Sequence, residues 1–162
     1  MTLTTTDTVE WPLGESATEL KTLINDYRLS NGKKPLRDCD SLNYVASMHV
    51  ANLNNWYKDT SLTLYSWINP REGREALIPK RTGDMAGSCR KPNELLGMKC
   101  LGYEMVHMHI DKGDYCTPEC AFAYFLSKPL YRDMILEEDF DSWSRMGISI
   151  YKYSASVWFT IK

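Results

Sequence analysis

Residues 146–161 read Met-Gly-Ile-Ser-Ile-Tyr-Lys-Tyr-Ser-Ala-Ser-Val-Trp-Phe-Thr-Ile. Apolar side chains recur at every second position, first at 146, 148 and 150 and then at 155, 157, 159 and 161. Because successive side chains of a strand point to opposite faces, this alternation predicts two strands that each bury one face. The phase changes near Tyr153-Ser154, which predicts a turn, so the stretch is expected to form a terminal β-hairpin.

Upstream of the hairpin, the first segment with the apolar spacing of a helix follows Ser16. Ser16-x-x-Glu19 has the form of a capping box, and apolar residues follow at positions 20, 23, 24 and 27. Gly32 can end this helix. Arg28 is expected on or beside the buried stripe, which is an unusual place for a charged side chain.

Further helices and one strand are indicated between this helix and the hairpin. A second helix should begin at Asp40 or Ser41, and residues 102–110 form a plausible strand. Thr117-Pro118 supplies an N-cap and a first-turn proline for a short helix, and residues 130–136 form another helical turn after a proline. Helices first and a β-rich end, with no βαβ repetition, predict an α+β domain with a mainly antiparallel central sheet.

Length and charge set the class of protein. The chain has 162 residues, 43% of them hydrophobic, and a net charge of -2. We expect one globular domain over residues 16–162, preceded by a flexible, threonine-rich N-terminal arm at 1–15. The charge balance provides no field for a polyanion, so no nucleic acid partner is expected. No apolar run is long enough to span a membrane, and residues 1–15 do not resemble a signal peptide.

The segment from Asp59 to about Leu101 is rich in glycine and proline and predicts a long, loop-rich connection with little regular structure. The chain also contains five cysteines. Their spacing does not match a zinc finger. They leave two alternatives open: structural disulfides in a secreted protein, or buried reduced thiols in a cytosolic one.

Several stretches, taken in order, resemble segments of the CAP superfamily, the cysteine-rich secretory, antigen 5 and pathogenesis-related proteins that share the SCP domain. They are residues 25–36 (N-D-Y-R through P-L), 44–53 (Y-V-A-S-M-H-V-A-N-L), 65–68 (Y-S-W-I), 90–95 (R-K-P-N-E-L), 102–104 (G-Y-E), 125–136 (F-L-S-K-P-L-Y-R-D-M-I-L) and the terminal strands. The resemblance covers about residues 18–160 and implies a three-layer α-β-α sandwich.

The resemblance also implies where a site would lie. The family cleft usually holds two histidines and two acidic residues, often with a divalent metal. Here Tyr65 and Tyr131 stand at the histidine positions, Glu104 matches one acid, and no residue clearly matches the second. Because a neutral phenol is a poor zinc ligand, we expect no metal and no cofactor in this cleft. A hydrogen-bonding cleft of Glu104, Tyr65 and Tyr131 would remain; alternatively, Glu104 only holds the long connection through backbone hydrogen bonds.

The three histidines have other interpretations. His49 falls within the apolar stripe of the second helix, which favours a core histidine with one satisfied nitrogen. His107, His109 and Asp111 alternate, so on a strand they would share one face, opposite Glu104. Such a triplet can bind zinc in principle, but His-x-His alone is a weak pattern, and we interpret it as the solvated face of an edge strand or loop. His107 could also edge the cleft.

The cysteines acquire candidate pairings through the resemblance, which favours secretion. A Cys89–Cys100 bridge would pin the long connection close to Glu104, and a Cys116–Cys120 bridge would tie the turn to the following helix. Cys39 would then remain as the free thiol. Aromatic side chains at positions 56, 57, 65 and 67 and at 124, 125 and 131 could line a groove for a lipid, sterol or glycan, or simply pack the loops.

These observations lead to two main functional hypotheses. The first is a non-enzymatic, extracellular CAP-type domain that binds a small amphipathic ligand, a glycan or a partner protein through a cleft near Glu104, Tyr65, Tyr131 and His107. The alternative is a hydrolase with a degenerate cleft, in which Glu104 acts as base and His107 assists. A purely structural or cell-surface interaction module is a third possibility, and a cytoplasmic location remains the alternative to secretion.

Overall fold

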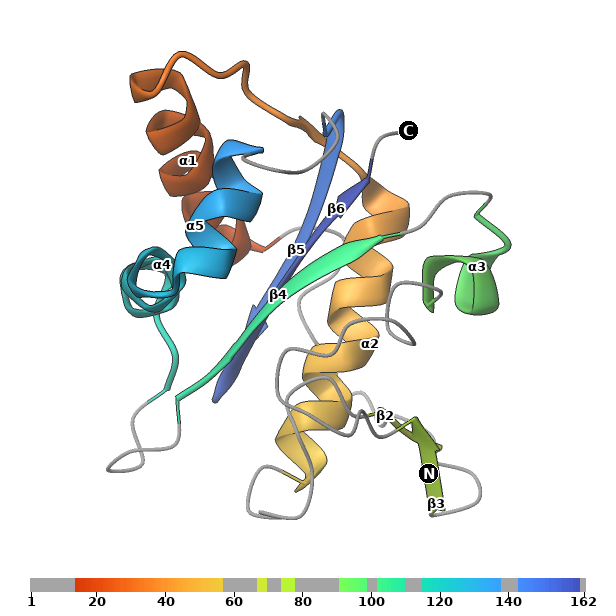
Figure 1. Ribbon diagram of the computed structural model, residues 1–162. Coiled ribbons are helices and arrows are strands. Elements are labelled where there is room, and N and C mark those ends of the chain that lie inside the picture. The colour runs from red at the N-terminus through yellow and green to blue at the C-terminus, as the bar shows by residue number, and fades with distance from the viewer. Residues whose placement is uncertain are drawn as a thin grey trace.

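The computed structural model describes residues 14–56, 67–69, 74–77, 91–98, 102–109, 115–137 and 143–160. Helices and strands are interspersed along the chain (Figure 1). In order they are α1 (Glu15–Ser30), β1 (Arg37–Asp38), α2 (Asp40–Trp56), β2 (Trp67–Asn69), β3 (Arg74–Leu77), α3 (Lys91–Leu96), β4 (Tyr103–Met108), α4 (Pro118–Ser127), α5 (Pro129–Leu136), β5 (Arg145–Tyr151) and β6 (Ser154–Thr160).

The central sheet has the strand order β1-β5-β6-β4. The predicted terminal hairpin is confirmed: β5 and β6 are antiparallel, with Met146 opposite Phe159 and Ile150 opposite Ala155. Strand β4 pairs antiparallel with the other side of β6, and the short β1 runs parallel to β5. The sheet is therefore mainly antiparallel, as predicted.

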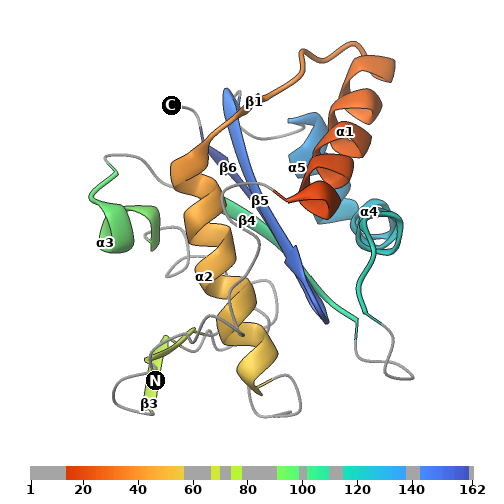
Figure 2. The same cartoon turned by 180° about the vertical axis from the view of Figure 1, so that it is seen from behind.

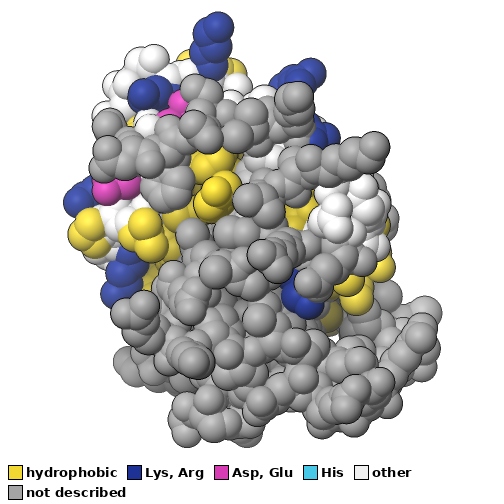
Figure 3. Space-filling view, turned by 45° about the vertical axis from the view of Figure 1, so that its right-hand side comes forward, with side chains coloured by type: hydrophobic (Ala, Val, Ile, Leu, Met, Phe, Trp, Pro, Cys, Tyr) yellow, Lys and Arg dark blue, Asp and Glu magenta, His cyan; other side chains and the backbone are white. Residues whose placement is uncertain are grey.

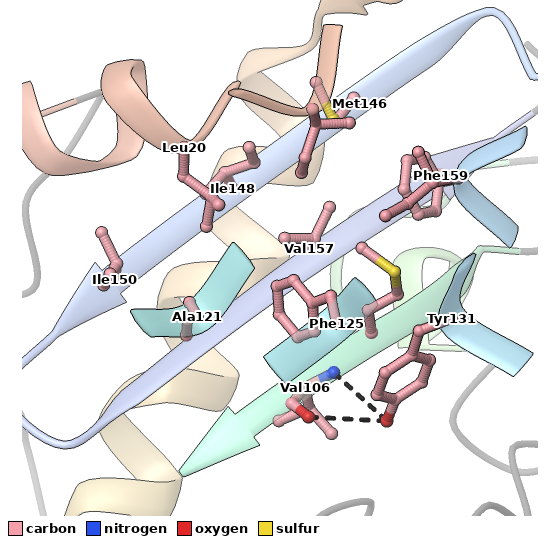
Figure 4. Packing of buried hydrophobic residues seen from close by; sticks show 14 of the residues in the cluster. Leu20, Val106, Ala121, Phe125, Tyr131, Met146, Ile148, Ile150, Val157 and Phe159 are labelled. Carbon is pink, nitrogen blue, oxygen red and sulfur yellow. Dashed lines mark hydrogen bonds between the residues drawn. The ribbon is translucent and has the colours of Figure 1, made fainter. Parts of the chain in front are cut away.

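Helices cover both faces of this sheet. Helix α2 crosses one face, and α1, α4 and α5 pack on the other, as opposite views of the chain show (Figures 1 and 2). The apolar residues of β5 and β6 at positions 146, 148, 150, 157 and 159 meet Leu20 of α1 and Phe125 of α4 in the larger core (Figure 4). The α+β, three-layer arrangement expected from the sequence is confirmed.

The approach of α2 to β5 is unusually close. Strand β1 ends at Asp38, and the chain turns directly into α2, with the Cys39 amide donating to the Met146 carbonyl at 3.0 Å. One turn further, the Asn43 side chain accepts a hydrogen bond from the Ile148 amide at 2.8 Å. The first turn of α2 thus continues the edge pairing that β1 begins, and this requires α2 backbone to lie directly over Gly147.

Arg28 is buried, as its position in the stripe of α1 predicts. Its guanidinium donates to the carbonyls of Lys34 and Ile135 and to the carboxylate of Glu137, the last at 2.8 Å. Burying an arginine is tolerated when its donors are paired in this way. The side chain therefore joins the C-terminal end of α1 to the end of α5.

Two details of the helices and the connection differ from the predictions. Helix α1 begins at Glu15 with Gly14 as its N-cap, so the capping box predicted at Ser16 lies slightly too late. The segment 59–101 contains more regular structure than predicted, because β2 and β3 pair and residues 91–96 form α3. The predicted start of α4, with Thr117 as cap and Pro118 in the first turn, is confirmed.

Candidate functional site

Glu104 lies in β4, on the face of the sheet that α2 covers. It is 1% exposed, and its Oε2 atom contacts Nδ1 of His49 from α2 and accepts a hydrogen bond from the Ser156 hydroxyl at 2.5 Å. His49 is itself completely buried, which confirms its interpretation as a core histidine. The acid that the CAP resemblance places in the cleft is therefore part of a polar cluster between helix and sheet.

The other predicted cleft residues lie elsewhere. Tyr131 of α5 is 7% exposed, and its hydroxyl lies 3.5 Å from both the amide nitrogen and the carbonyl oxygen of Val106 (Figure 4). His107 points to this same side of the sheet, where its ring contacts Phe125. The structure thus places Tyr131 and His107 near the α4 and α5 layer, and Glu104 near α2. Tyr65 lies outside the described residues.

A different group of polar side chains comes together at the end of β4. One ligand-type atom from each of His107, His109 and Cys120 lies within 4.8 Å of the others. The Cys120 Sγ atom is 3.5 Å from Nδ1 of His109 and 3.9 Å from Nε2 of His107. Two imidazoles and a thiol in this arrangement form a candidate metal centre.

The backbone explains why these side chains meet. His107 and His109 are two residues apart, so the extended chain turns both to one face. The amide of His109 donates to the Tyr153 carbonyl at 2.6 Å, which continues the β4–β6 pairing past Met108. Cys120 is in the first turn of α4, where its amide donates to the capping Thr117 hydroxyl at 3.1 Å. The end of β4 therefore positions the two imidazoles, and the first turn of α4 positions the thiol.

The sequence interpretation of His-x-His as a solvated face is wrong for His107. Its side chain is only 8% exposed and its ring lies 4.1 Å, centroid to centroid, from that of Tyr124. Burial, followed in importance by the nearby His109, lowers the pKa of His107 from 6.5 to about 4. The ring is therefore neutral at pH 7. Asp111, the third member of the predicted triplet, lies outside the described residues.

The low pKa of His107 predicts a pH dependence of stability. Between pH 6.5 and about 4 the unfolded chain binds a proton at this ring and the folded protein does not, so the free energy of unfolding should fall as the pH is lowered through this window. The groups facing the ring are His109, Cys120 and Tyr124. Thermal unfolding with chelator present should show a weaker acid dependence in His107→Phe than in the wild type; equal slopes would contradict this assignment.

The predicted bridge between Cys116 and Cys120 is not formed. Both are free thiols, as is the buried Cys39. The Cys116 thiol is buried and contacts the Thr117 carbonyl, whereas the Cys120 thiol turns toward the two imidazoles. Burial, with a smaller effect of Cys120, raises the pKa of Cys116 to about 12. Cys89 and Cys100, the other predicted pair, lie outside the described residues.

Exposed apolar side chains are scattered over the described surface. The large ones are Leu29 in α1, Leu95 and Leu96 in α3, Tyr115 before α4 and Leu130 in α5. On the face drawn in Figure 3, apolar side chains stand beside basic and acidic ones. Singly exposed apolar residues are normal on soluble domains, so none of these marks a groove. The aromatic residues Tyr124, Phe125 and Tyr131 pack against one another, but they do so within helices α4 and α5 and not in loops.

Comparison with solved structures identifies the class of fold. The chain is similar to a cysteine-rich secretory protein from Staphylococcus aureus, with a TM-score of 0.57 and 17% sequence identity over 93% of this chain. It is also similar to an outer surface protein from Borrelia burgdorferi, with a TM-score of 0.61 and 15% identity over 90% of this chain. The first likeness covers 40% of the staphylococcal chain and the second 92% of the Borrelia chain.

At these identities the similarity establishes a CAP-like fold and nothing finer. No protein-family model matches the chain. No curated protein matches it by sequence. Of the helices that the structure describes, none has the length and apolar character to cross a membrane.

Proposed function

We propose that this chain is a CAP-like extracellular binding or interaction domain that does not use the acid of the family cleft for catalysis. Its ligand is a small amphipathic molecule, a glycan or a partner protein. The observation that carries the proposal is the environment of Glu104, which is 1% exposed and bonded to His49 and Ser156. A general base must come within hydrogen-bond reach of the proton it abstracts, and a carboxylate enclosed in this way does not reach a substrate.

The replacement of the family's histidines supports the same proposal. Tyr65 and Tyr131 occupy those positions, and Tyr131 uses its hydroxyl on the backbone of β4. The buried Tyr131 phenol hydrogen-bonds the β4 backbone, which is a structural role and not that of an exposed metal ligand. We therefore propose that the family metal site is lost.

The hydrolase alternative gains no support from the geometry. It needs Glu104 and His107 at one reacting centre, but successive positions of β4 alternate between the two faces of the sheet. Glu104 contacts α2, while His107 contacts Tyr124 and Phe125 of α4. The sheet itself separates the two groups.

An extracellular location is part of the proposal. The structures with similar folds are a secretory protein and an outer surface protein, and this supports the location by analogy of fold. Cys39, Cys116 and Cys120 are free thiols. The proposed location therefore draws no support from disulfides among these three residues.

The test combines a binding screen with an activity screen. Glycans, fatty acids, sterols and generic ester, peptide and glycoside substrates are added to wild-type protein and to Glu104→Gln, a replacement of nearly equal shape. We expect a saturable rise in melting temperature with at least one compound and no turnover of any substrate. Binding should be the same in both proteins, because Glu104 is enclosed between α2 and the sheet.

Two outcomes would contradict the proposal. One is hydrolysis by the wild type that disappears in Glu104→Gln while the melting temperature of the variant stays within a few degrees of the wild type, because this assigns catalysis to the acid. The other is stoichiometric zinc in wild-type protein that is lost on Tyr131→Phe or Glu104→Gln, because this restores the family metal site.

A further inference from the structure

We propose that His107, His109 and Cys120 form a binding site for a transition-metal ion of the zinc class, with one coordination position open to solvent or to a ligand. The site uses none of Glu104, Tyr65 and Tyr131, and it stands whether or not the proposed function is correct. The sequence leads us to expect no metal, because tyrosines stand at the family's histidine positions and His-x-His alone is a weak pattern. The thiol that completes the group lies beyond a turn, in α4.

The two distances from the thiol to the imidazoles are close to those around a tetrahedral ion. Bonds of about 2.0–2.1 Å to nitrogen and 2.3 Å to sulfur, at tetrahedral angles, place nitrogen and sulfur about 3.6 Å apart. The observed separations from the Cys120 Sγ atom are 3.5 Å to His109 and 3.9 Å to His107. The three ligand-type atoms all lie within 4.8 Å of one another, so a single ion between them is within reach of each side chain.

The chemistry of the ligands indicates which ions fit. Imidazole suits zinc, copper, iron and nickel, and a thiolate favours zinc and copper, whereas magnesium and calcium require oxygen ligands. None of the three side chains offers oxygen. With three protein ligands and a fourth position open, the arrangement is of the kind that leaves room for a water or another molecule on the ion.

The surroundings hold the ligands without closing the site. His107 is held by its contact with Tyr124, the two ring centroids lying 4.1 Å apart. His109 and Cys120 are partly exposed, so an ion can enter from their side. Cys116, two residues before α4, directs its own thiol to the Thr117 carbonyl and is therefore not counted among the ligands.

Cobalt(II) titration is the direct test. The purified full chain is treated with a chelator and a phosphine reductant, returned to chelator-free buffer, and titrated with cobalt(II). We expect one ion per chain, thiolate-to-cobalt charge-transfer absorption in the near ultraviolet and intense visible bands of a tetrahedral ion. Added zinc should displace the cobalt and bleach both features.

Variants assign the ligands. Cys120→Ser should abolish the charge-transfer band and weaken binding at least tenfold, and His109→Gln should weaken binding to a similar extent. Both side chains are partly exposed, so both variants should fold, which far-ultraviolet circular dichroism checks. Cys39→Ser is the matched control, since this thiol lies against Arg145, away from the site, and its removal should leave the spectrum unchanged.

The proposal is overturned if cobalt binds without a charge-transfer band, or if the band survives in Cys120→Ser. It is equally overturned if a Cys89→Ser, Cys100→Ser double variant removes the band, because the thiolate would then come from a different part of the chain. None of these three results bears on the role of Glu104, so failure here can be distinguished from failure of the proposed function.

Discussion

Replacing His49 by alanine is expected to lower the free energy of unfolding by about 3–5 kcal/mol, as when one partner of a buried pair is removed. His49 and Glu104 are 0% and 1% exposed, and water cannot take the place of the lost ring without entering the space between α2 and the sheet. Ser156 would remain as a hydrogen-bond donor to Glu104, which offsets only part of the loss. Urea denaturation followed by circular dichroism measures the change.

Two further variants make this expectation specific to the pair. Glu104→Gln keeps the shape and one acceptor oxygen for the contacts with His49 and Ser156, so it should cost clearly less than His49→Ala. The double variant His49→Leu, Glu104→Leu removes both polar groups and should recover much of the stability, because apolar residues of similar volume often replace a buried pair at little cost. A His49→Ala protein within about 1 kcal/mol of the wild type would show that the pair has no structural role.

Replacing Gly147 by alanine is expected to destabilise the protein by about 3 kcal/mol or more, at the upper end of the cost of overpacking a core. A Cβ atom at this position would lie 2.5 Å from the amide nitrogen of Asn43 and closer still to Leu42. The atoms in the way include the backbone of α2, which cannot move aside as a flexible side chain can. The helix would have to shift, and the hydrogen bond from the Ile148 amide to Asn43 would be strained or lost.

Ser149→Ala is the matched control on the same strand. Ser149 lies two residues further along β5, so it faces the same side, and its buried hydroxyl has no hydrogen-bond partner among the described residues. Because an unpaired buried hydroxyl is unfavourable, its removal should leave stability unchanged or raise it slightly. Chemical denaturation of both variants gives the comparison; a Gly147→Ala protein as stable as the wild type would contradict the close approach of α2.

Much of the fold could be predicted because its elements have strong local signals. The period-two alternation of residues 146–161 marks the hairpin, and Thr117-Pro118 marks the start of α4. Strand β1 has no such signal, because two residues cannot show a period and their pairing depends on β5. The start of α1 was misplaced for a related reason: Gly14 caps the helix without a side-chain hydrogen bond, whereas Ser16 only has the form of a cap.

The candidate sites depend on tertiary contacts more than the helices and strands do, so the sequence predicts them less well. The CAP resemblance marks Glu104 as an acid of interest, but its burial follows from the packing of α2, whose His49 is 55 residues away. The same resemblance suggests a disulfide between Cys116 and Cys120, whereas in the structure the Cys120 thiol is free and faces two imidazoles from another element. The sequence signal for this metal site is His-x-His followed by a cysteine beyond a turn. It indicates a site only once β4 and α4 are known to lie side by side.

Anomalous diffraction at the zinc absorption edge, from crystals of the full chain grown with zinc, tests both metal assignments at once. We expect one ordered peak between His107, His109 and Cys120, and none next to Glu104 and Tyr131. A peak next to Glu104 would contradict the loss of the family metal site, and an empty His107, His109 and Cys120 group at saturating zinc would contradict the new one.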